Sequence, residues 1–289
     1  MPVFESLAPI SVSVEIVGDV RITASDRTDT VVDVRPHDPA KASDVKAAQE
    51  TRVEYADGAL AVTTPKHWTR YTPFGGAEAV DVTIEVPTGS SLDVASGMGD
   101  LHTEGELGRC QLKTGMGRIR LDQTGDLEAD SGYGDISVDR ATGDAMVTTG
   151  SGHVRIGAVD GSLTVRNANG DTAVGETTGE ARVRAANGDV VIDRAHTSVT
   201  ARTANGNLRV RDVSHGSIDL QTAAGELEIG IHEGTAAWLD LTSKYGLVRN
   251  SLDAADGPAS DDGTVQVRGR TSAGNILVLR ARADHPTPS

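Results

Sequence analysis

The sequence contains a single cysteine, Cys110, and very few aromatic residues. Two tryptophans, four tyrosines and two phenylalanines make up only 3% of its 289 residues. One cysteine excludes an intrachain disulfide and the zinc motifs that require several cysteines. So few rings exclude a thick core built from aromatic side chains, and favour a thin core of small, β-branched residues.

The sequence also lacks an apolar stretch of the length that spans a membrane. Residues 1–16 mix Glu5, Pro9 and Glu15 with apolar residues, without the basic start and apolar run of a secretory signal. We therefore expect a cytoplasmic protein without membrane insertion. Lys and Arg total 27 against 42 Asp and Glu, and the formal charge of −15 opposes general attraction to nucleic acid or anionic lipid.

Glycine, by contrast, is abundant and recurs at a regular interval. Short turn motifs end in glycine every 17 to 19 residues, at positions 99, 117, 134, 152, 170, 188, 206 and 225, and less regularly at 246 and 274. Gly and Asn exchange within these motifs, as in residues 132–134 and 186–188. Because both residue types tolerate positive φ, this exchange predicts a left-handed backbone at the turn. A second series of turns lies midway between them.

Between the turns, apolar and polar residues alternate with period two, which is the signature of β-strands. Each repeat holds two such strands, and neither can bury its apolar face alone, so stacked repeats are required. The sequence therefore predicts an all-β fold: a right-handed single-stranded parallel β-helix, or β-solenoid, with coils of about 18 residues and irregular end caps. Cys110 falls in an apolar column beside Leu127, which predicts a small buried side chain rather than a nucleophile.

The two ends of the chain depart from the repeat. Residues 1–96 contain strand-like runs without the regular glycine turn, and we expect β-rich opening coils that cap the solenoid. Within them, the amphipathic stretch 40–50 predicts a helix over the exposed edge. The regular coils are expected over 97–282, with 276–279 as the last paired strand, and residues 283–289 are expected to be a disordered tail.

The loop 65–76 concentrates aromatic residues. Exposed aromatic and arginine side chains are typical interface anchors, which favours a partner-binding patch. The alternative is that the rings plug the end of the core. The candidate partner-binding residues are Trp68, Arg70, Tyr71 and Phe74.

A polar column follows the turn glycines and includes Asp171 and Asp189 in successive repeats. If the two stack, their separation would approach the ~5 to 5.5 Å of the carboxylate pair in a retaining glycosidase. The simpler interpretation is that they support the turns through backbone hydrogen bonds. His153 and Asn207 could join them around a cation, but a flat ladder surrounds an ion poorly. The sequence therefore predicts no catalytic residue, no metal site and no cofactor.

Another polar column places arginines in three successive repeats, with Lys113 further along. Guanidinium groups roughly 5 Å apart repel one another unless anions or acids lie between them. Anion binding is one interpretation, because guanidinium groups hold phosphates and carboxylates well. Pairing with nearby acids, or simple solvation, is the alternative. The candidate anion-binding residues are Arg166, Arg184 and Arg202.

The repeated Gly-x-Gly-Asp-Ile-x-Val and Thr-x-x-Gly pattern, as in 132–138 and 149–156, carries a resemblance to a known family. It resembles the β-strand-repeat family of unknown function that bears the label "putative adhesin". The similarity covers nearly the whole chain, including residues 86–90 before the first regular coil, and its style is similar to that of actinobacterial members. The resemblance implies a right-handed β-helix with no shared catalytic residues.

A non-catalytic binding or scaffold protein is therefore the predicted function, with an unidentified protein or glycan as partner. Two alternatives stay open. One is a carbohydrate-active hydrolase or lyase that uses Asp171, Asp189 and Arg184. The other is a polymer-forming structural protein resembling bactofilins, a homo-oligomer assembled through the solenoid ends.

Overall fold

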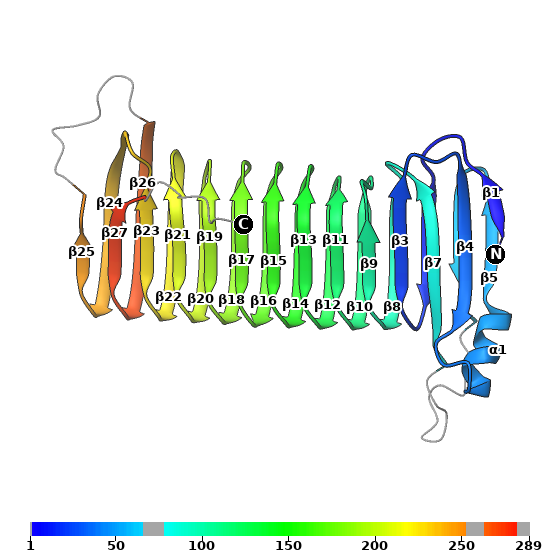
Figure 1. Ribbon diagram of the computed structural model, residues 1–289. Coiled ribbons are helices and arrows are strands. Elements are labelled where there is room, and N and C mark those ends of the chain that lie inside the picture. Colours follow the sequence, from blue (N-terminus) through cyan, green and yellow to red (C-terminus); the bar gives the residue numbers. More distant parts are fainter. Residues whose placement is uncertain (1, 66–77, 253–262, 282–289) are drawn as a thin grey trace, which may run out of the picture. The chain divides into compact units, whose positions relative to one another are not determined.

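The computed structural model describes residues 2–65, 78–252 and 263–281 (Figure 1). The chain forms two compact units, Met1–Ser151 and Gly152–Ser289, and each contains strands in two layers. The one helix among the described residues, α1 (Ala42–Glu50), has nine residues, so none of the described helices is long enough to cross a bilayer. The helix predicted for 40–50 is therefore confirmed, and it packs on two strands of the first unit, β4 and β7.

Neighbouring strands in the layers of the first unit are far apart in sequence. One layer runs in the order β1 (Val3–Glu5), β4 (Asp29–Pro36), β7 (Val80–Pro87), β3 (Val20–Ser25), β9 (Leu101–Glu104), β11 (Ile119–Thr124) and β13 (Ile136–Ala141). The other runs β14 (Ala145–Ser151), β12 (Leu127–Tyr133), β10 (Cys110–Met116), β8 (Ser91–Met98), β2 (Ser11–Ile16), β6 (Ala59–Thr63) and β5 (Arg52–Ala56). Pairing is antiparallel for β1 with β4, β4 with β7 and β5 with β6, and parallel among the regular strands.

The second unit repeats the parallel arrangement. One layer runs in the order β15 (Val154–Val159), β17 (Thr172–Thr177), β19 (Val190–Ala195), β21 (Leu208–Val213), β23 (Leu227–Ile231), β27 (Ile276–Arg280) and β25 (Val248–Asn250). The other runs β16 (Leu163–Asn169), β18 (Ala181–Asn187), β20 (Val199–Asn205), β22 (Gly216–Ala224), β26 (Gly263–Ala273) and β24 (Thr235–Tyr245).

The last strands in the sequence are not the last strands in the layers. β26 pairs with both β22 and β24, and β27 pairs with both β23 and β25. The chain therefore forms the outer strands β24 and β25 first. It then returns, and β26 inserts between β22 and β24 while β27 inserts between β23 and β25. Residues 276–279 lie in β27, which is the last strand in the sequence and is paired, as predicted, but the edge of the layer is formed by β25.

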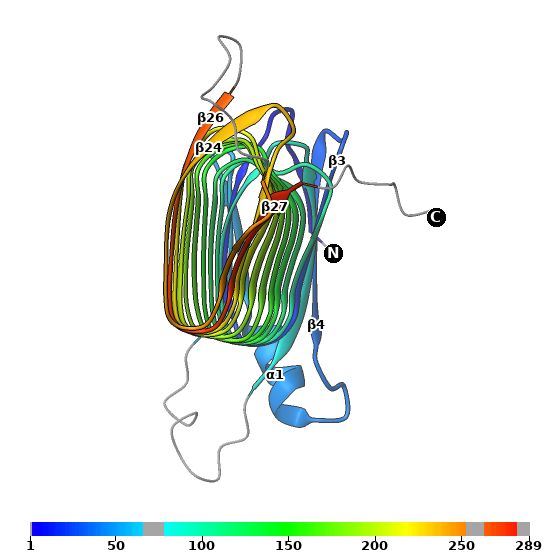
Figure 2. The ribbon, with the colours of Figure 1, turned by 90° about the vertical axis from the view of Figure 1, so that its left-hand side faces the viewer.

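The core of each unit is thin and consists mainly of small apolar side chains. Alternate residues of each regular strand are buried, as Ala181 and Val183 are in β18. Figure 2 shows the strands arranged in two layers. Residues paired in register are 17 to 19 positions apart, for example Cys110 with Leu127, Leu127 with Ala145, and Val199 with Ile218. The all-β class with two layers rich in parallel strands is confirmed, whereas the handedness and coil size of the solenoid stay predictions.

The turn glycines from Gly99 to Gly225, and Gly274, have positive φ values, as predicted, whereas Gly246 does not and asparagine does not share this conformation. Gly188 has φ of +133°, and a Cβ there would lie 2.2 Å from the carbonyl oxygen of Gly170 in the preceding coil. Asn187 stands one position earlier, and among the described residues the only non-glycine with positive φ is Asp57. The expected exchange of Gly and Asn at the left-handed position is therefore wrong. Only glycine fits, because both the dihedral angle and the next coil exclude a side chain.

Candidate functional site

The strand registers of the second unit set the predicted arginines in line. Arg166, Arg184 and Arg202 are register partners on β16, β18 and β20, and all three point outward because the residues on either side of each are buried or half-buried. The line continues through Gln221 on β22 to Arg270 on β26. Parallel pairing therefore turns a spacing of 18 residues in the sequence into a row of neighbouring guanidinium groups.

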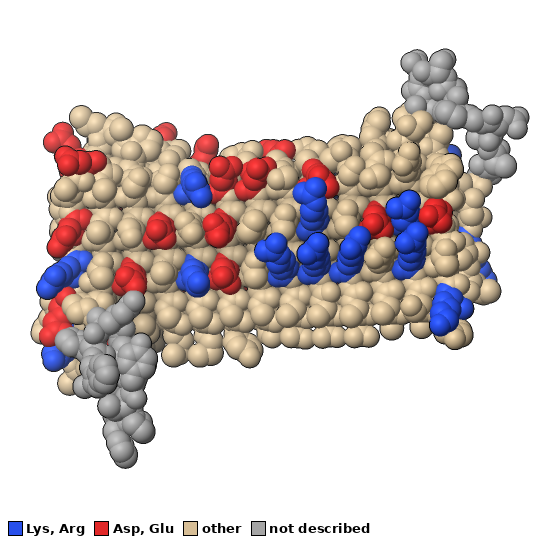
Figure 3. Space-filling view, turned by 180° about the vertical axis from the view of Figure 1, so that it is seen from behind, with Lys and Arg blue, Asp and Glu red and all other residues tan. Residues whose placement is uncertain are grey.

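We call this surface the arginine face, and it consists of Arg166, Arg184, Arg202, Gln221, Arg270 and Lys244. A row of blue side chains over the second unit is visible in Figure 3. No hydrogen bond or ion pair to Arg166 or Arg184 is formed within the described part of the chain. These two side chains therefore keep their donors available to a ligand, as the anion-binding interpretation requires.

A flat strip of small side chains borders the row. Each residue of the row, Gln221 included, is followed two positions later by a small residue that also points outward. These small residues lie on consecutive strands and are Ala168, Ala186, Ala204, Ala223 and Ser272. These side chains lie low beside the long arginine side chains, and Figure 3 shows an uninterrupted tan strip there. A ligand can therefore reach the guanidinium groups from one side without displacing bulky neighbours.

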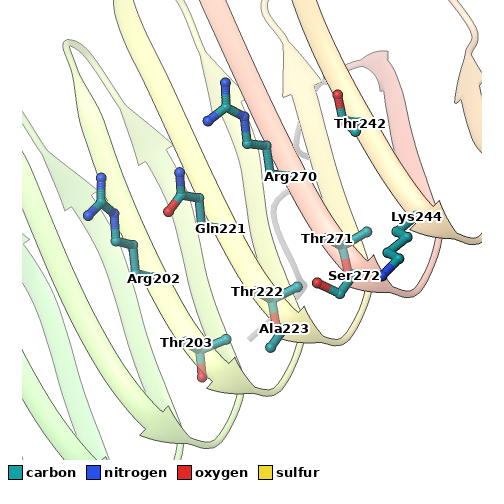
Figure 4. Close-up of a pocket in the computed structure, with 10 residues that line it drawn as sticks. All are labelled: Arg202, Thr203, Gln221, Thr222, Ala223, Thr242, Lys244, Arg270, Thr271 and Ser272. Atoms are coloured by element: carbon teal, nitrogen blue, oxygen red, sulfur yellow. The ribbon is translucent and has the colours of Figure 1, made fainter.

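The row ends in a shallow groove of about 560 Å³ between β20 and β24 (Figure 4). Arg202, Gln221 and Arg270 stand side by side in it, and Lys244 comes from β24. The remaining lining residues are Thr203, Thr222, Ala223, Thr242, Thr271 and Ser272. Three cations and exposed hydroxyl groups at Thr242 and Ser272 make this groove suited to an anion and poor for an apolar ligand.

Both arginines that line the groove already have acidic neighbours. Arg202 lies 3.3 Å from Asp219, and Arg270 lies 3.7 Å from Asp240, which also pairs with Arg268 at 3.2 Å. All of these groups are partly exposed, so each pair contributes at most ~1 kcal/mol of stability. The alternative of pairing with nearby acids is therefore realised at Arg202 and Arg270, and the donors that remain can still bind a ligand.

The aspartate column has a structural role in the turns. The Asp189 backbone N–H donates to Asp171 Oδ1 at 2.9 Å, and the Asn207 backbone N–H donates to Asp189 Oδ1 at 2.8 Å. Each carboxylate thus accepts a hydrogen bond from the next coil, rather than from its own turn as first expected. His153 lies 3.8 Å from Asp171. Both aspartates contribute to stacking of the coils, and Asp189 uses both of its oxygens, since Oδ2 accepts the Asn207 Nδ2 amide at 3.2 Å.

The first unit has the same turn arrangement with an added cation. The Arg118 backbone N–H donates to Asp100 Oδ1 at 2.8 Å, and the Arg118 guanidinium donates to Oδ2 at 2.8 Å. Partial burial raises the pKa of Asp100, but these two hydrogen bonds and the positive charge outweigh it and hold that pKa below its ordinary value. The first unit has no matching row of cations at Lys113, because the register partner of Lys113 on the next strand is the acidic Asp130. The positive row therefore belongs to the second unit.

Cys110 is buried, as predicted. Its side chain is fully enclosed, and burial raises the pKa of the thiol to about 11. A thiol that stays protonated is a poor nucleophile.

Sequence reasoning found three arginines of the site, missed two of its cations and also proposed the aromatic loop. Trp68, Arg70, Tyr71 and Phe74 lie outside the described residues. Arg270 was missed, although counting four residues back from Gly274 reaches it, just as counting back from Gly188 reaches Arg184. Lys244 carries no such signal, because its place beside Arg270 depends on the order of β24 and β26.

The family model described as Toastrack DUF4097 matches residues 8–278. The chain belongs to this family. The predicted family resemblance is thereby supported at the level of the family, and the actinobacterial style stays a prediction. No curated protein matches the sequence.

Solved structures similar to this Toastrack chain have low sequence identity. A protein from Bacteroides fragilis described as "a putative adhesin" has 14% identity and a TM-score of 0.38, with 96% of this chain and 95% of that chain covered. A "putative lipid binding protein" from Parabacteroides distasonis has 10% identity and a TM-score of 0.32, with coverage of 96% and 95%. A "putative cell adhesion protein" from Clostridium sporogenes has 8% identity and a TM-score of 0.22, with coverage of 96% and 98%. These similarities leave the ligand of the present chain open.

Proposed function

We propose that this chain is a non-catalytic binding protein whose arginine face holds a short acidic segment of a partner protein. The row of Arg166, Arg184 and Arg202, aligned by strand register and continued by Arg270, carries the proposal. Guanidinium groups bind carboxylates through two parallel hydrogen bonds, which favours Asp and Glu side chains as ligands.

The charge of the whole chain limits the length of the ligand. The chain carries a formal charge of −15, so a long polyanion would meet repulsion outside the arginine face. A short acidic segment confined to the row avoids most of it, because exposed charges more than ~10 Å apart are screened at 0.1 M salt.

The side chains of the groove favour a peptide over nucleic acid or sugar. Single-stranded nucleic acid is usually held by aromatic rings on which bases stack, and the groove lining contains no ring. Its threonine and serine hydroxyls and the Gln221 amide are suited to a peptide backbone, which offers both donors and acceptors. We therefore choose the protein over the glycan among the two partner classes predicted from the sequence.

A matched pair of triple variants tests the proposal. Arg166→Ser/Arg184→Ser/Arg202→Ser removes three charges from the face. Arg155→Ser/Arg209→Ser/Arg211→Ser removes three from the other layer of the same unit. Fluorescence anisotropy with a labelled Glu-rich peptide should show binding weakened by at least ~10-fold in the first variant only, equivalent to ~1.4 kcal/mol.

Three outcomes would contradict the proposal: no binding by the unmodified chain, an equal loss in both variants, or tighter binding of a single-stranded oligonucleotide or a uronic-acid oligosaccharide. An equal loss would show general electrostatic attraction. Circular dichroism and a thermal melt should show that both variants remain folded.

The hydrolase alternative receives less support, because Asp171 and Asp189 both accept backbone hydrogen bonds from the adjacent coil. The polymer alternative also receives less support. The first unit's layers include the antiparallel strands β1 and β5, whereas stacking of parallel coils needs parallel edges. A sedimentation mass near 30.0 kDa at high concentration is the result expected of a chain that does not polymerise. The cytoplasmic location stays a prediction, which cell fractionation tests.

A further inference from the structure

We propose that Asp19, His37 and Asp81 in the first unit form a binding site for a divalent metal ion of the zinc type. One ligand atom of each side chain lies within 4.8 Å of the other two. His37 Nδ1 is 2.8 Å from Asp81 Oδ1, and the two side chains are 52% and 40% exposed. The site is therefore open to an ion from solvent and is independent of the arginine face.

Backbone hydrogen bonds bring the three residues together from distant parts of the sequence. The Asp19 carbonyl accepts the Val82 N–H at 2.9 Å, which places Asp19 next to the strand that carries Asp81. The His37 N–H donates to the Ala79 carbonyl at 3.2 Å, which fixes His37 beside the same strand. The three ligands therefore start from a fixed backbone framework, so metal binding costs little ordering of the chain.

A nearby buried carboxylate holds this framework in place. Asp44, on α1, is almost fully enclosed and accepts the backbone N–H groups of Ala79 and Asp38, at 3.2 and 3.3 Å. It thereby ties α1 to the segments on which His37 and Asp81 stand. Its charge also adds to the negative potential, although Lys41 lies 3.1 Å from it.

The local field favours a cation. The negative charges of Asp81, Asp19 and Asp44 all act on the position of His37, and the same charges attract a divalent cation to it. The Asp19 Oδ1 atom accepts the Asp100 backbone N–H at 2.9 Å, which orients that carboxylate. A divalent ion would neutralise the two carboxylates and take the imidazole nitrogen as a third ligand.

The mixture of donor atoms decides the class of metal. One imidazole nitrogen and two carboxylate oxygens are ligands that Zn²⁺ accepts at about 2.0 to 2.2 Å. Ca²⁺ prefers six to eight oxygen ligands, and Mg²⁺ retains most of its waters, so neither gains as much from the histidine. Three protein ligands leave a fourth position of the tetrahedron for water.

Isothermal titration of the full, untagged chain with ZnCl₂ at pH 7.5 tests the site. We expect one strong binding event per chain. His37→Asn and Asp81→Asn should each weaken it by on the order of 100-fold, since loss of even a second-shell partner costs ~10- to 100-fold. Asp19 is left unchanged because its carboxylate also supports the neighbouring turn.

His102→Asn is the matched control. His102 Nε2 lies 2.8 Å from Glu104 Oε1, so it forms the same kind of histidine–carboxylate pair without a second acid in a metal-binding cluster. Its loss should leave zinc affinity unchanged. A zinc-dependent rise in melting temperature, absent in His37→Asn, provides a second readout, because a ligand that binds only the folded state stabilises it.

No saturable zinc binding by the unmodified chain would overturn the proposal. So would equal affinity in the unmodified chain and a folded His37→Asn variant, and so would an equal loss of affinity in His102→Asn. The first result would mean that His37 and Asp81 form only an ion pair that holds β4 to β7.

Discussion

At the scale of single residues, glycine at the turns has two separate causes that the structure distinguishes. Gly188 has both a positive φ and a close carbonyl oxygen in the preceding coil. Gly234 has a positive φ of +75° and no atom within 4 Å of an added Cβ. Replacement of each glycine by alanine therefore separates steric exclusion from backbone strain.

We predict that Gly188→Ala lowers the free energy of unfolding by about 3 kcal/mol or more, since strain and overpacking add. Gly234→Ala, with strain alone, should cost only about 1 to 2 kcal/mol. Urea unfolding followed by circular dichroism measures both. Equal losses would show that the preceding coil moves away from the added methyl group at no cost in free energy.

Because Cys110 is buried, the free energy of unfolding should fall as the pH rises into the alkaline range. Burial raises its pKa from 9.0 to about 11, so between these values the folded chain retains a proton that the unfolded chain releases. The stabilisation is fully present below pH 9 and is lost as pH rises towards 11, at up to ~1.4 kcal/mol per pH unit.

We therefore predict that the stability difference between the unmodified chain and Cys110→Ala shrinks by about 1 kcal/mol from pH 8.5 to pH 10. The comparison removes contributions from other groups that titrate in this range. Urea unfolding at both pH values provides the measurement, and a difference that does not change with pH would contradict the buried, protonated thiol.

At the scale of elements, the strands are tied to their neighbours by side-chain ladders as well as by backbone pairing. Asn169, Asn187 and Asn205 form such a ladder, with Nδ2 to Oδ1 distances of 2.9 and 3.0 Å. The aspartates after the turns form another, in which each carboxylate accepts the next backbone N–H. Both ladders follow from identical residues in identical positions of stacked coils.

We predict that Asp189→Ala lowers the free energy of unfolding by about 1 kcal/mol, because the Asn207 N–H loses its acceptor. Asp189→Asn keeps an oxygen in place and should cost less than half as much. Chemical denaturation of the two variants measures both losses of stability. A similar loss in both would show that the charge, not the hydrogen bond, stabilises the turn.

The order of the strands near the end of the second unit has a measurable consequence. β24 and β25 are paired on one side only among the described strands, whereas β26 and β27 are paired on both. Side chains of the outer pair are accordingly more exposed. Val248 is 45% exposed although it continues an apolar column.

Hydrogen exchange should therefore be faster in β24 and β25 than in β26 and β27, even though the latter come later in the sequence. Native-state exchange read by mass spectrometry measures this. Faster exchange in β26 and β27 would contradict the observed order and would favour the simple succession of coils.

At the scale of the whole molecule, one positive row lies on a strongly acidic chain. Such a charge distribution restricts binding of anions to that row. We predict that raising NaCl from 50 to 300 mM weakens binding of the Glu-rich peptide several-fold, while the Arg166→Ser/Arg184→Ser/Arg202→Ser variant responds much less. Anisotropy at several salt concentrations measures it. An equal salt response in both proteins would place the binding elsewhere.

The sequence by itself determined the repeat, the buried columns and the alignment of the three arginines. These features depend on local alternation and on a nearly constant spacing, so each coil carries its own information. The buried Cys110 and the short helix α1 were predictable for the same reason.

Only the tertiary structure decided the order of β24 to β27, the contribution of Lys244 to the groove and the meeting of Asp19, His37 and Asp81. Each of these depends on pairing between segments that long connections separate. The entropy of closing a loop changes only slowly with its length, so the sequence spacing does not say which strand becomes the neighbour. Packing of the coils against one another makes that choice.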